Sequence, residues 1–133
     1  MSIAMKWSNW APQLRSVLRI VAAFMFMQAG TIKLFGWPMA MPAGMKLQLM
    51  SQTGFGGILE TFGGGLLLLG LFTRPIAFIL AGEMAVAYFQ FHFPKGFWPA
   101  VNQGQPAVLY CFIWLYLSAA GAGPWSIDAM RGK

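Results

Sequence analysis

The sequence predicts an all-α membrane protein, with four transmembrane helices in an antiparallel bundle. Of its 133 residues, 58% are hydrophobic and 9% are charged, whereas about a quarter of the residues in a soluble domain are charged. Only helices or closed barrels satisfy the backbone hydrogen bonds of a chain inside lipid. The apolar stretches here are continuous, and the alternation typical of a membrane barrel is missing. Helices are therefore the predicted structure.

Four apolar segments are long enough to be predicted as spans, and their connections are short enough for a single domain covering residues 1–133. An apolar run of about 19 residues matches a helix that crosses roughly 30 Å of hydrocarbon. The N-terminal piece before the first span carries Trp7 and Trp10, which predict a segment on the membrane surface. The predicted spans cover approximately residues 13–35, 54–72, 75–93 and 107–121.

The basic residues predict the orientation of the four spans. Six of them fall on the side that holds both termini and the connection at Thr73 and Arg74: Lys6, Arg15, Arg19, Arg74, Arg131 and Lys133. Three fall on the opposite side: Lys33, Lys46 and Lys95. Because basic residues concentrate on the cytoplasmic side of a membrane, both termini are expected in the cytoplasm. Arg15 and Arg19 are expected to extend back to the interface.

The net charge of +6 does not indicate nucleic-acid binding, because the basic residues are scattered and form no basic face. One cysteine and one histidine cannot make a zinc site. The sequence also lacks a haem ligand pair, iron–sulfur cysteines and a nucleotide-binding loop. No metal and no covalently bound cofactor are therefore expected, and the chain is not expected to be a self-sufficient oxidoreductase.

Two of the three acidic residues, Glu60 and Glu83, lie inside predicted spans. A carboxylate at that depth is costly, so each is expected to face the bundle interior with a partner. In antiparallel neighbours the two would differ in depth by about 6 Å, and two carboxylates that close do not both ionise readily. Either one is protonated or a base such as Lys33 lies between them. Lys33 itself has two interpretations, as an interface anchor or as a cation that reaches Glu60.

Two further features are candidates for function or packing. His92 ends the third span, where it is either an interfacial residue or a hydrogen-bond donor to a quinone-like head group. Gly56 and Gly64 lie four residues to either side of Glu60, on the same helical face. Small residues at this spacing let another helix approach closely, so both glycines are predicted helix-packing positions.

Three stretches in this order and spacing resemble the DoxX family of small bacterial membrane proteins. They are residues 29–35, residues 60–75, and His92 together with residues 96–98. The resemblance extends from about residue 15 to residue 121. It implies a multi-pass protein of four helices in the bacterial inner membrane and a link to redox chemistry. Some relatives are described as subunits of thiosulfate:quinone oxidoreductases, and others as partners of soluble enzymes that handle thiols or superoxide.

One position departs from the family pattern. Relatives often carry an acidic residue just before the fourth span, where this chain has Gln105. A role that depends on a negative charge in that loop is therefore not carried over to this chain.

Three functions remain open at this point. The first is an accessory membrane subunit of an oxidoreductase complex, in which Lys33, Glu60, Glu83 and His92 bind a quinone and a partner supplies the electrons. The second is a non-catalytic scaffolding subunit of a larger membrane assembly. The third is a small proton-coupled carrier that uses both carboxylates. The expected partners are membrane lipid and either other proteins of a complex or further copies of this chain.

Overall fold

The computed structural model describes residues 3–39 and 52–132, and all of the regular structure in these ranges is helical. This confirms the all-helical part of the predicted fold class. η1 and η2 are π-helical and η3 is a 3₁₀ helix. The elements in chain order are α1 (Ile3–Ser8), α2 (Ala11–Phe35), α3 (Gln52–Ile58), η1 (Leu59–Gly63), α4 (Gly64–Leu69), α5 (Thr73–Ala87), η2 (Tyr88–His92), η3 (Phe93–Lys95), α6 (Pro99–Asn102), α7 (Gln105–Ala120) and α8 (Ile127–Met130).

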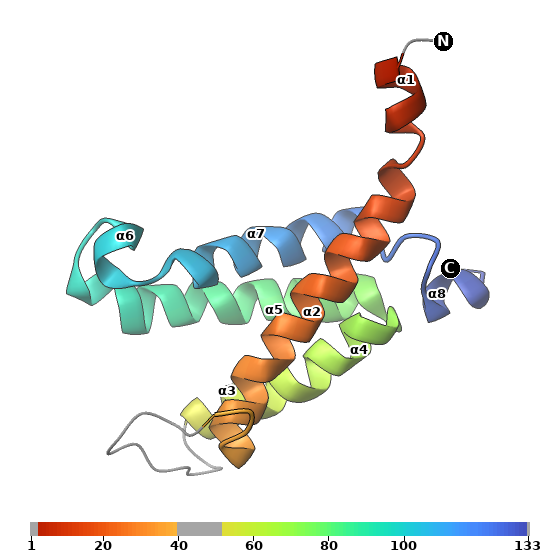
Figure 1. Ribbon diagram of the computed structural model, residues 1–133. Coiled ribbons are helices and arrows are strands. Elements are labelled where there is room, and N and C mark those ends of the chain that lie inside the picture. The colour runs from red at the N-terminus through yellow and green to blue at the C-terminus, as the bar shows by residue number, and fades with distance from the viewer. Residues whose placement is uncertain (1–2, 40–51, 133) are drawn as a thin grey trace.

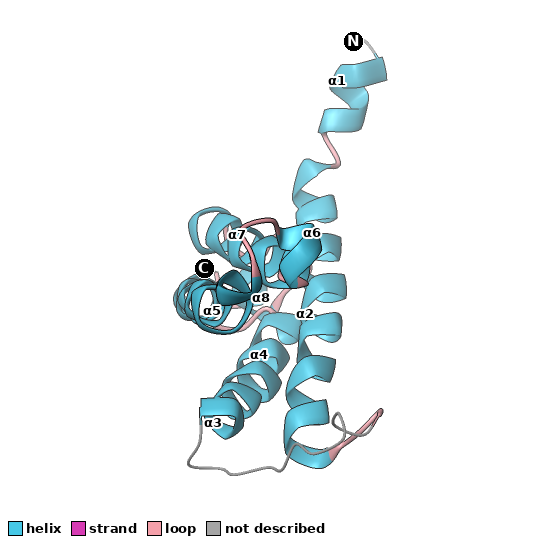
Figure 2. Ribbon diagram, turned by 90° about the vertical axis from the view of Figure 1, so that its left-hand side faces the viewer, coloured by secondary structure: helices cyan, strands magenta, loops and turns pink. Residues whose placement is uncertain are grey.

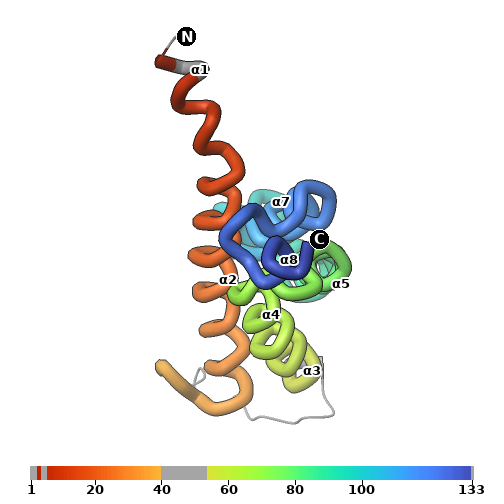
Figure 3. Tube along the Cα trace, turned by 90° about the vertical axis from the view of Figure 1, so that its right-hand side faces the viewer, coloured from red at the N-terminus to blue at the C-terminus, as the bar shows by residue number. Residues whose placement is uncertain are grey.

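The helices form two antiparallel pairs that cross each other. α2 packs against the continuous rod of α3, η1 and α4, while α5 packs against α7. Figure 2 looks along α5 and α7 and shows α2 and α4 standing across them. α1 and the first turns of α2 extend beyond the other helices (Figure 3). Glu60 of η1 and Glu83 of α5 approach each other where the two pairs cross.

Two of the helical segments are long and apolar enough to cross a membrane. These are Ala11–Phe35, with 25 residues, and Thr73–Lys95, with 23 residues. Gly54–Leu69 and Gln105–Ala120 are shorter apolar helices. These four segments lie where the sequence predicts its spans.

The outer surface of the helices is apolar, and the buried core is small. Phe24, Phe78 and Phe112 lie on three different helices and are each more than half exposed. The core centres on Phe26 and Trp114, whose rings meet edge to face at 5.3 Å. Extended apolar surface of this kind marks contact with a membrane or with another protein.

The turn between α4 and α5 lies earlier than the predicted connection at Thr73 and Arg74. α4 ends because Gly70 adopts a left-handed conformation, with φ of 70°. The Leu71 amide donates to the Leu66 carbonyl and the Gly70 amide donates to the Leu67 carbonyl, which is the Schellman pattern of a helix end. Thr73 therefore already belongs to α5.

Arg19 does not extend to the interface as predicted; its side chain is buried. The guanidinium donates to the carbonyls of Leu67 and Trp125, each at 2.8 Å, and to that of Ala122. The last carbonyls of a helix lack partners within it, and a cation there is also favoured by the helix dipole. Arg19 thus joins α2 to the end of α4 and to the segment before α8.

Candidate functional site

The predicted polar residues of the spans meet where the two helix pairs cross. The Lys33 ammonium lies 2.8 Å from Oε2 and 2.9 Å from Oε1 of Glu60. Glu60 is 1% exposed, while the side chain of Lys33 is 34% exposed. Of the two interpretations of Lys33, the structure shows the cation that reaches Glu60.

Glu83 joins this pair from α5. A Cβ atom placed on Gly56 would lie 3.3 Å from Oε2 of both Glu60 and Glu83, and 3.9 Å from the Lys33 nitrogen. The Oε1 atom of Glu83 is buried without a hydrogen-bond partner. Two carboxyl groups brought this close in a buried site do not both ionise readily. The three groups therefore form one cluster around Gly56.

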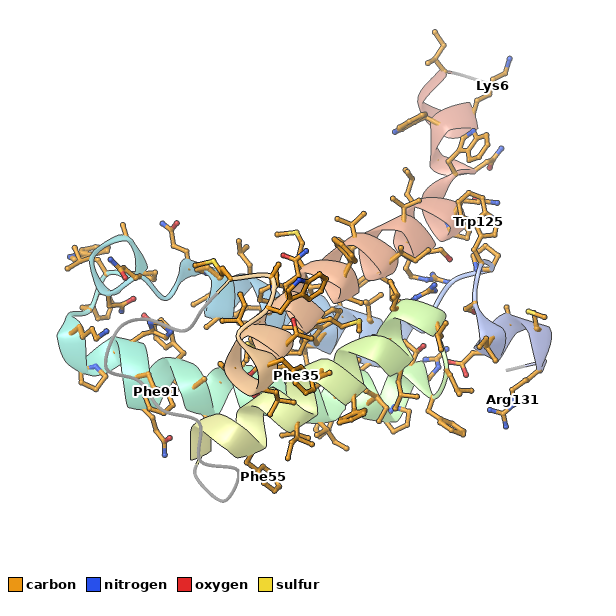
Figure 4. All side chains as sticks on the ribbon, turned by 60° about the horizontal axis from the view of Figure 1, so that its bottom comes forward. Lys6, Phe35, Phe55, Phe91, Trp125 and Arg131 are labelled. Atoms are coloured by element: carbon orange, nitrogen blue, oxygen red, sulfur yellow. The ribbon has the colours of Figure 1, made fainter. Side chains whose placement is uncertain are left out.

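A pocket of about 670 Å³ lies beside this cluster. Its walls come from both helix pairs, namely from α2, α3, η1, α5, η2 and α7, and they are mostly apolar. Lys33, Glu60, Glu83 and His92 all line it. The structure thus brings all four predicted site residues to a single cavity. Phe55 and Phe91, which also line it, are labelled in Figure 4.

Both π-helical segments of the described chain contribute to this pocket. η1 contains Glu60 and η2 ends at His92. Single π turns inside α-helices are rare and occur frequently at functional sites. On α2, a Cβ atom on Gly30 would lie 2.5 Å from the Thr61 amide nitrogen. Gly30 therefore lets α2 approach the backbone of η1, which places Lys33 within reach of Glu60.

His92 is held by a second polar cluster at the end of the pocket. Its Nδ1 atom lies 3.0 Å from the carbonyl oxygen of Asn102, and its ring stacks on Tyr88 at 6.2 Å. The buried side-chain amide of Asn102 donates to the Tyr88 hydroxyl and to the Gly96 carbonyl. Sequence reasoning missed Asn102. The available signal was an asparagine two residues before Gly104, since asparagine side chains often bind the backbone two residues on.

The two predicted packing glycines have different surroundings. A Cβ atom on Gly64 would lie 2.7 Å from Cγ of Met27, so Gly64 is a close contact between α4 and α2. Gly56 instead borders the charged cluster. Both glycines therefore lie against other residues of the same chain.

Comparison with known families supports the resemblance. The family model named DoxX matches residues 14–93, which include Lys33, Glu60, Glu83 and His92. The chain belongs to the DoxX family. This DoxX protein is also 42% identical over 123 residues to an uncharacterised protein of Haemophilus influenzae, covering 90% of this chain and 92% of the relative. No solved structure matches it significantly. Family membership and the apolar helices together identify a membrane protein.

Proposed function

We propose that this DoxX protein is a four-span subunit of the bacterial inner membrane that binds a quinone for a redox complex. The observation that carries the proposal is the pocket, in which mostly apolar walls surround the cluster of Lys33, Glu60 and Glu83. Binding sites for small apolar ligands have this composition, with a few convergent polar groups that orient the ligand. Quinones are lipid-soluble and carry two ring carbonyls that accept hydrogen bonds.

The charges of the cluster favour an uncharged head group. Two carboxyl groups face one ammonium group, and that ammonium already contacts both oxygens of Glu60. A phosphate or carboxylate ligand would be repelled by the carboxyl groups. A carbonyl oxygen can accept a hydrogen bond from a protonated carboxyl or from the ammonium. The cluster therefore supports a neutral ligand with carbonyl oxygens.

The carboxyl pair supplies a place to hold a proton beside the ligand. Reduction of a quinone consumes two electrons and two protons, and the electrons would come from a protein partner of the complex. In this proposal Glu60 and Glu83 hold one proton between them, because two close buried carboxyl groups do not both ionise readily, and Lys33 neutralises the remaining negative charge. Proton exchange at this pair is the part of the chemistry that we assign to this chain.

A proton-coupled carrier is the second candidate, because the same buried carboxyl pair would serve a proton relay within the membrane. The scaffolding alternative is supported less well. Gly56 and Gly64, the glycines that would pack against other chains, make contacts inside this one.

The test is purification from native membranes in a mild detergent, followed by mass spectrometry of the extracted lipids and copurifying proteins. We expect near-stoichiometric quinone with the wild-type chain and its loss from Glu60→Gln, while circular dichroism shows both to be folded. Phe112→Leu, on the lipid-facing side of α7, is the control that should retain quinone. Absence of quinone from the wild-type protein, together with proton-coupled uptake by reconstituted liposomes, would favour the carrier.

A further inference from the structure

We infer that the pocket opens sideways into the bilayer between α3 and α5, and that Gly82 at this opening determines what can enter. The inference rests on the proposed function, because it concerns how a quinone with an apolar tail reaches the charged cluster. It assigns an entry route and a size-determining residue to the site.

The exposed part of the pocket lining is apolar and belongs to one side of the molecule. Phe55 of α3 is 63% exposed, and Phe91 of η2 is 49% exposed. Ile79 and Val86 of α5, between them, are 53% and 51% exposed. Figure 4 shows Phe55 and Phe91 toward the same edge of the molecule. The opposite wall, with Glu60 and other residues of the core, is buried. The opening is therefore lined by side chains suited to lipid.

The depth of this opening follows from its position along α5. Gly82 lies nine residues after the start of the segment Thr73–Lys95, or about 14 Å along a helix. If this segment spans roughly 30 Å of hydrocarbon, Gly82 lies near mid-depth. The opening then faces acyl chains, and a ligand that enters through it comes from the lipid phase.

Gly82 is the position where a larger side chain would narrow the opening without disturbing the fold. It lines the pocket, and a Cβ atom added to it would meet nothing within 4 Å. Ile79 and Val86 lie three residues before and four after it, on the same helical face. A side chain at position 82 would therefore extend between them at the pocket mouth. Gly57 lacks this free space, because a Cβ atom there would lie 3.0 Å from Leu34.

The occupant that fits these features is a quinone with a long apolar tail. Its ring would lie against Gly82 with the carbonyls toward Glu83, and the tail would leave between Phe55 and Phe91. An anionic phospholipid head group does not suit the two carboxyl groups of the cluster. A tailless quinone would fill the polar end but lose the contacts at the opening.

The first test compares Gly82→Leu with the matched substitution Gly65→Leu, which lies outside the pocket and whose Cβ would meet only Met27 at 3.8 Å. The wild-type protein and both variants are reconstituted in nanodiscs with decylubiquinone, and the retained quinone is quantified. We expect Gly82→Leu to retain about tenfold less, since overfilling a site by one side chain weakens binding on that order, with unchanged thermal stability. Gly65→Leu should match the wild type. Full retention by Gly82→Leu would overturn the inference and leave the proposed function intact.

The second test locates the opening even if no quinone binds. Replacing the lone cysteine by alanine allows a nitroxide label at Ile79→Cys, with Lys95→Cys as the reference at the end of the helix. We expect electron paramagnetic resonance to show strong relaxation of the label at position 79 by oxygen, which partitions into lipid, and weak relaxation by a water-soluble nickel complex. Strong relaxation by nickel at position 79 would show a water-filled entrance and overturn the inference. Absence of quinone from every nanodisc sample of the first test would instead contradict the proposed function.

Discussion

The ion pair of Lys33 and Glu60 is asymmetric at the scale of single residues. Glu60 is almost completely buried, whereas a third of the Lys33 side chain is exposed. If Lys33 is removed, the Glu60 carboxylate keeps its burial and loses its cation. If the charge of Glu60 is removed, Lys33 can move its flexible chain toward the exposed side. The cost of breaking the pair therefore depends on which partner is changed.

We expect Lys33→Met to destabilise the protein more than Glu60→Gln. Leaving one charge of a buried pair uncompensated costs about 3–5 kcal/mol, and Lys33→Met should approach that range while Glu60→Gln falls below it. The double variant should recover part of the loss. Thermal unfolding of the wild type, the two single variants and the double variant in one detergent measures this double-mutant cycle. A larger loss of stability for Glu60→Gln than for Lys33→Met would contradict the asymmetry.

Gly30 permits the contact that aligns the ion pair. A Cβ atom there would lie 2.5 Å from the amide nitrogen of Thr61 and 2.9 Å from the carbonyl carbon of Glu60, which are backbone atoms that cannot rotate away. Gly30→Ala should therefore separate α2 from η1 at a cost of about 1–3 kcal/mol. Gly65→Ala, where a methyl group makes only ordinary contact, should be neutral or stabilising because alanine favours helices. Equal melting temperatures for the two variants would rule out this role for Gly30.

The residues of the site were partly accessible from the sequence because charge is rare in this chain. Glu60 and Glu83 stand out as acids inside apolar runs, and Lys33 follows because it is predicted near the same membrane surface as Glu60. Asn102 does not stand out, because a polar residue in a loop has no unusual cost until the fold buries it. Arg19 was misassigned for a related reason. The sequence pattern of α2 shows a buried face. It does not show that this face meets the unpaired carbonyls at the end of α4, which can accept hydrogen bonds from a cation.

At the scale of elements, the short helix α8 holds the turn between α4 and α5. The Asp128 carboxylate accepts hydrogen bonds from the amides of Phe72 and Thr73, each at 2.9 Å. The Asp128 amide donates to the Gly70 carbonyl at 2.8 Å. The Arg131 guanidinium lies 5.0 Å above the Phe72 ring, within the range of a cation–π contact. A four-residue helix thus caps α5 and fixes the C-terminal segment.

This cap should make stability depend on acid pH. Burial alone would raise the pKa of Asp128, but the amide hydrogen bonds from Thr73 and Phe72 outweigh it and hold the pKa below its ordinary value. A lowered pKa in the folded state means stability that is present above the ordinary pKa and lost as pH falls through the folded value. Asp128→Asn should therefore melt below the wild type at pH 7, and the difference should shrink toward pH 3. Melting curves of both proteins across this range test it, and a constant difference would contradict it.

The sequence predicts the helical elements better than their ends and faces. Gly70 carried a usable signal for the end of α4, because glycine commonly terminates helices in a left-handed conformation. The π turns at Glu60 and His92 carried no such signal. In α7 almost every residue is apolar, so periodicity could not show that Trp114 and Leu117 face inward.

At the scale of the whole molecule, the steep crossing of the two helix pairs bears on how they would span a membrane. If both pairs cross one bilayer, they must tilt in opposite directions, and tilts of up to about 40° are observed for membrane helices. α2, with 25 residues, is about 37 Å long and exceeds the hydrocarbon thickness of roughly 30 Å. Its first turns and α1 extend beyond the other helices (Figure 3). They therefore suit the head-group region, where Trp7 and Trp10 would act as interfacial aromatics.

The contacts of the folded chain place several basic residues at one end of these spans. Arg19 contacts the segment before α8, and Arg74 contacts the Ala119 carbonyl at the end of α7. Arg131 lies on the turn between α4 and α5. Lys33 forms the ion pair with Glu60 at the site, and Lys46 lies outside the described residues. Lys95 remains as the basic residue at the opposite end of α5 and its extension. The charge difference between the ends thus persists in the fold.

This difference predicts four spans with both termini in the cytoplasm, by the positive-inside rule. In a Cys111→Ala background, a membrane-impermeant maleimide applied to intact spheroplasts should label Lys95→Cys. It should label Met130→Cys, which is highly exposed on α8, only after the membrane is permeabilised. Met130 and Lys95 are separated by a single predicted span, α7. Labelling of both from outside would therefore show that α7 does not cross the membrane. Labelling of Met130→Cys alone would show the opposite orientation, with the basic cluster of Arg19, Arg74 and Arg131 on the outer side.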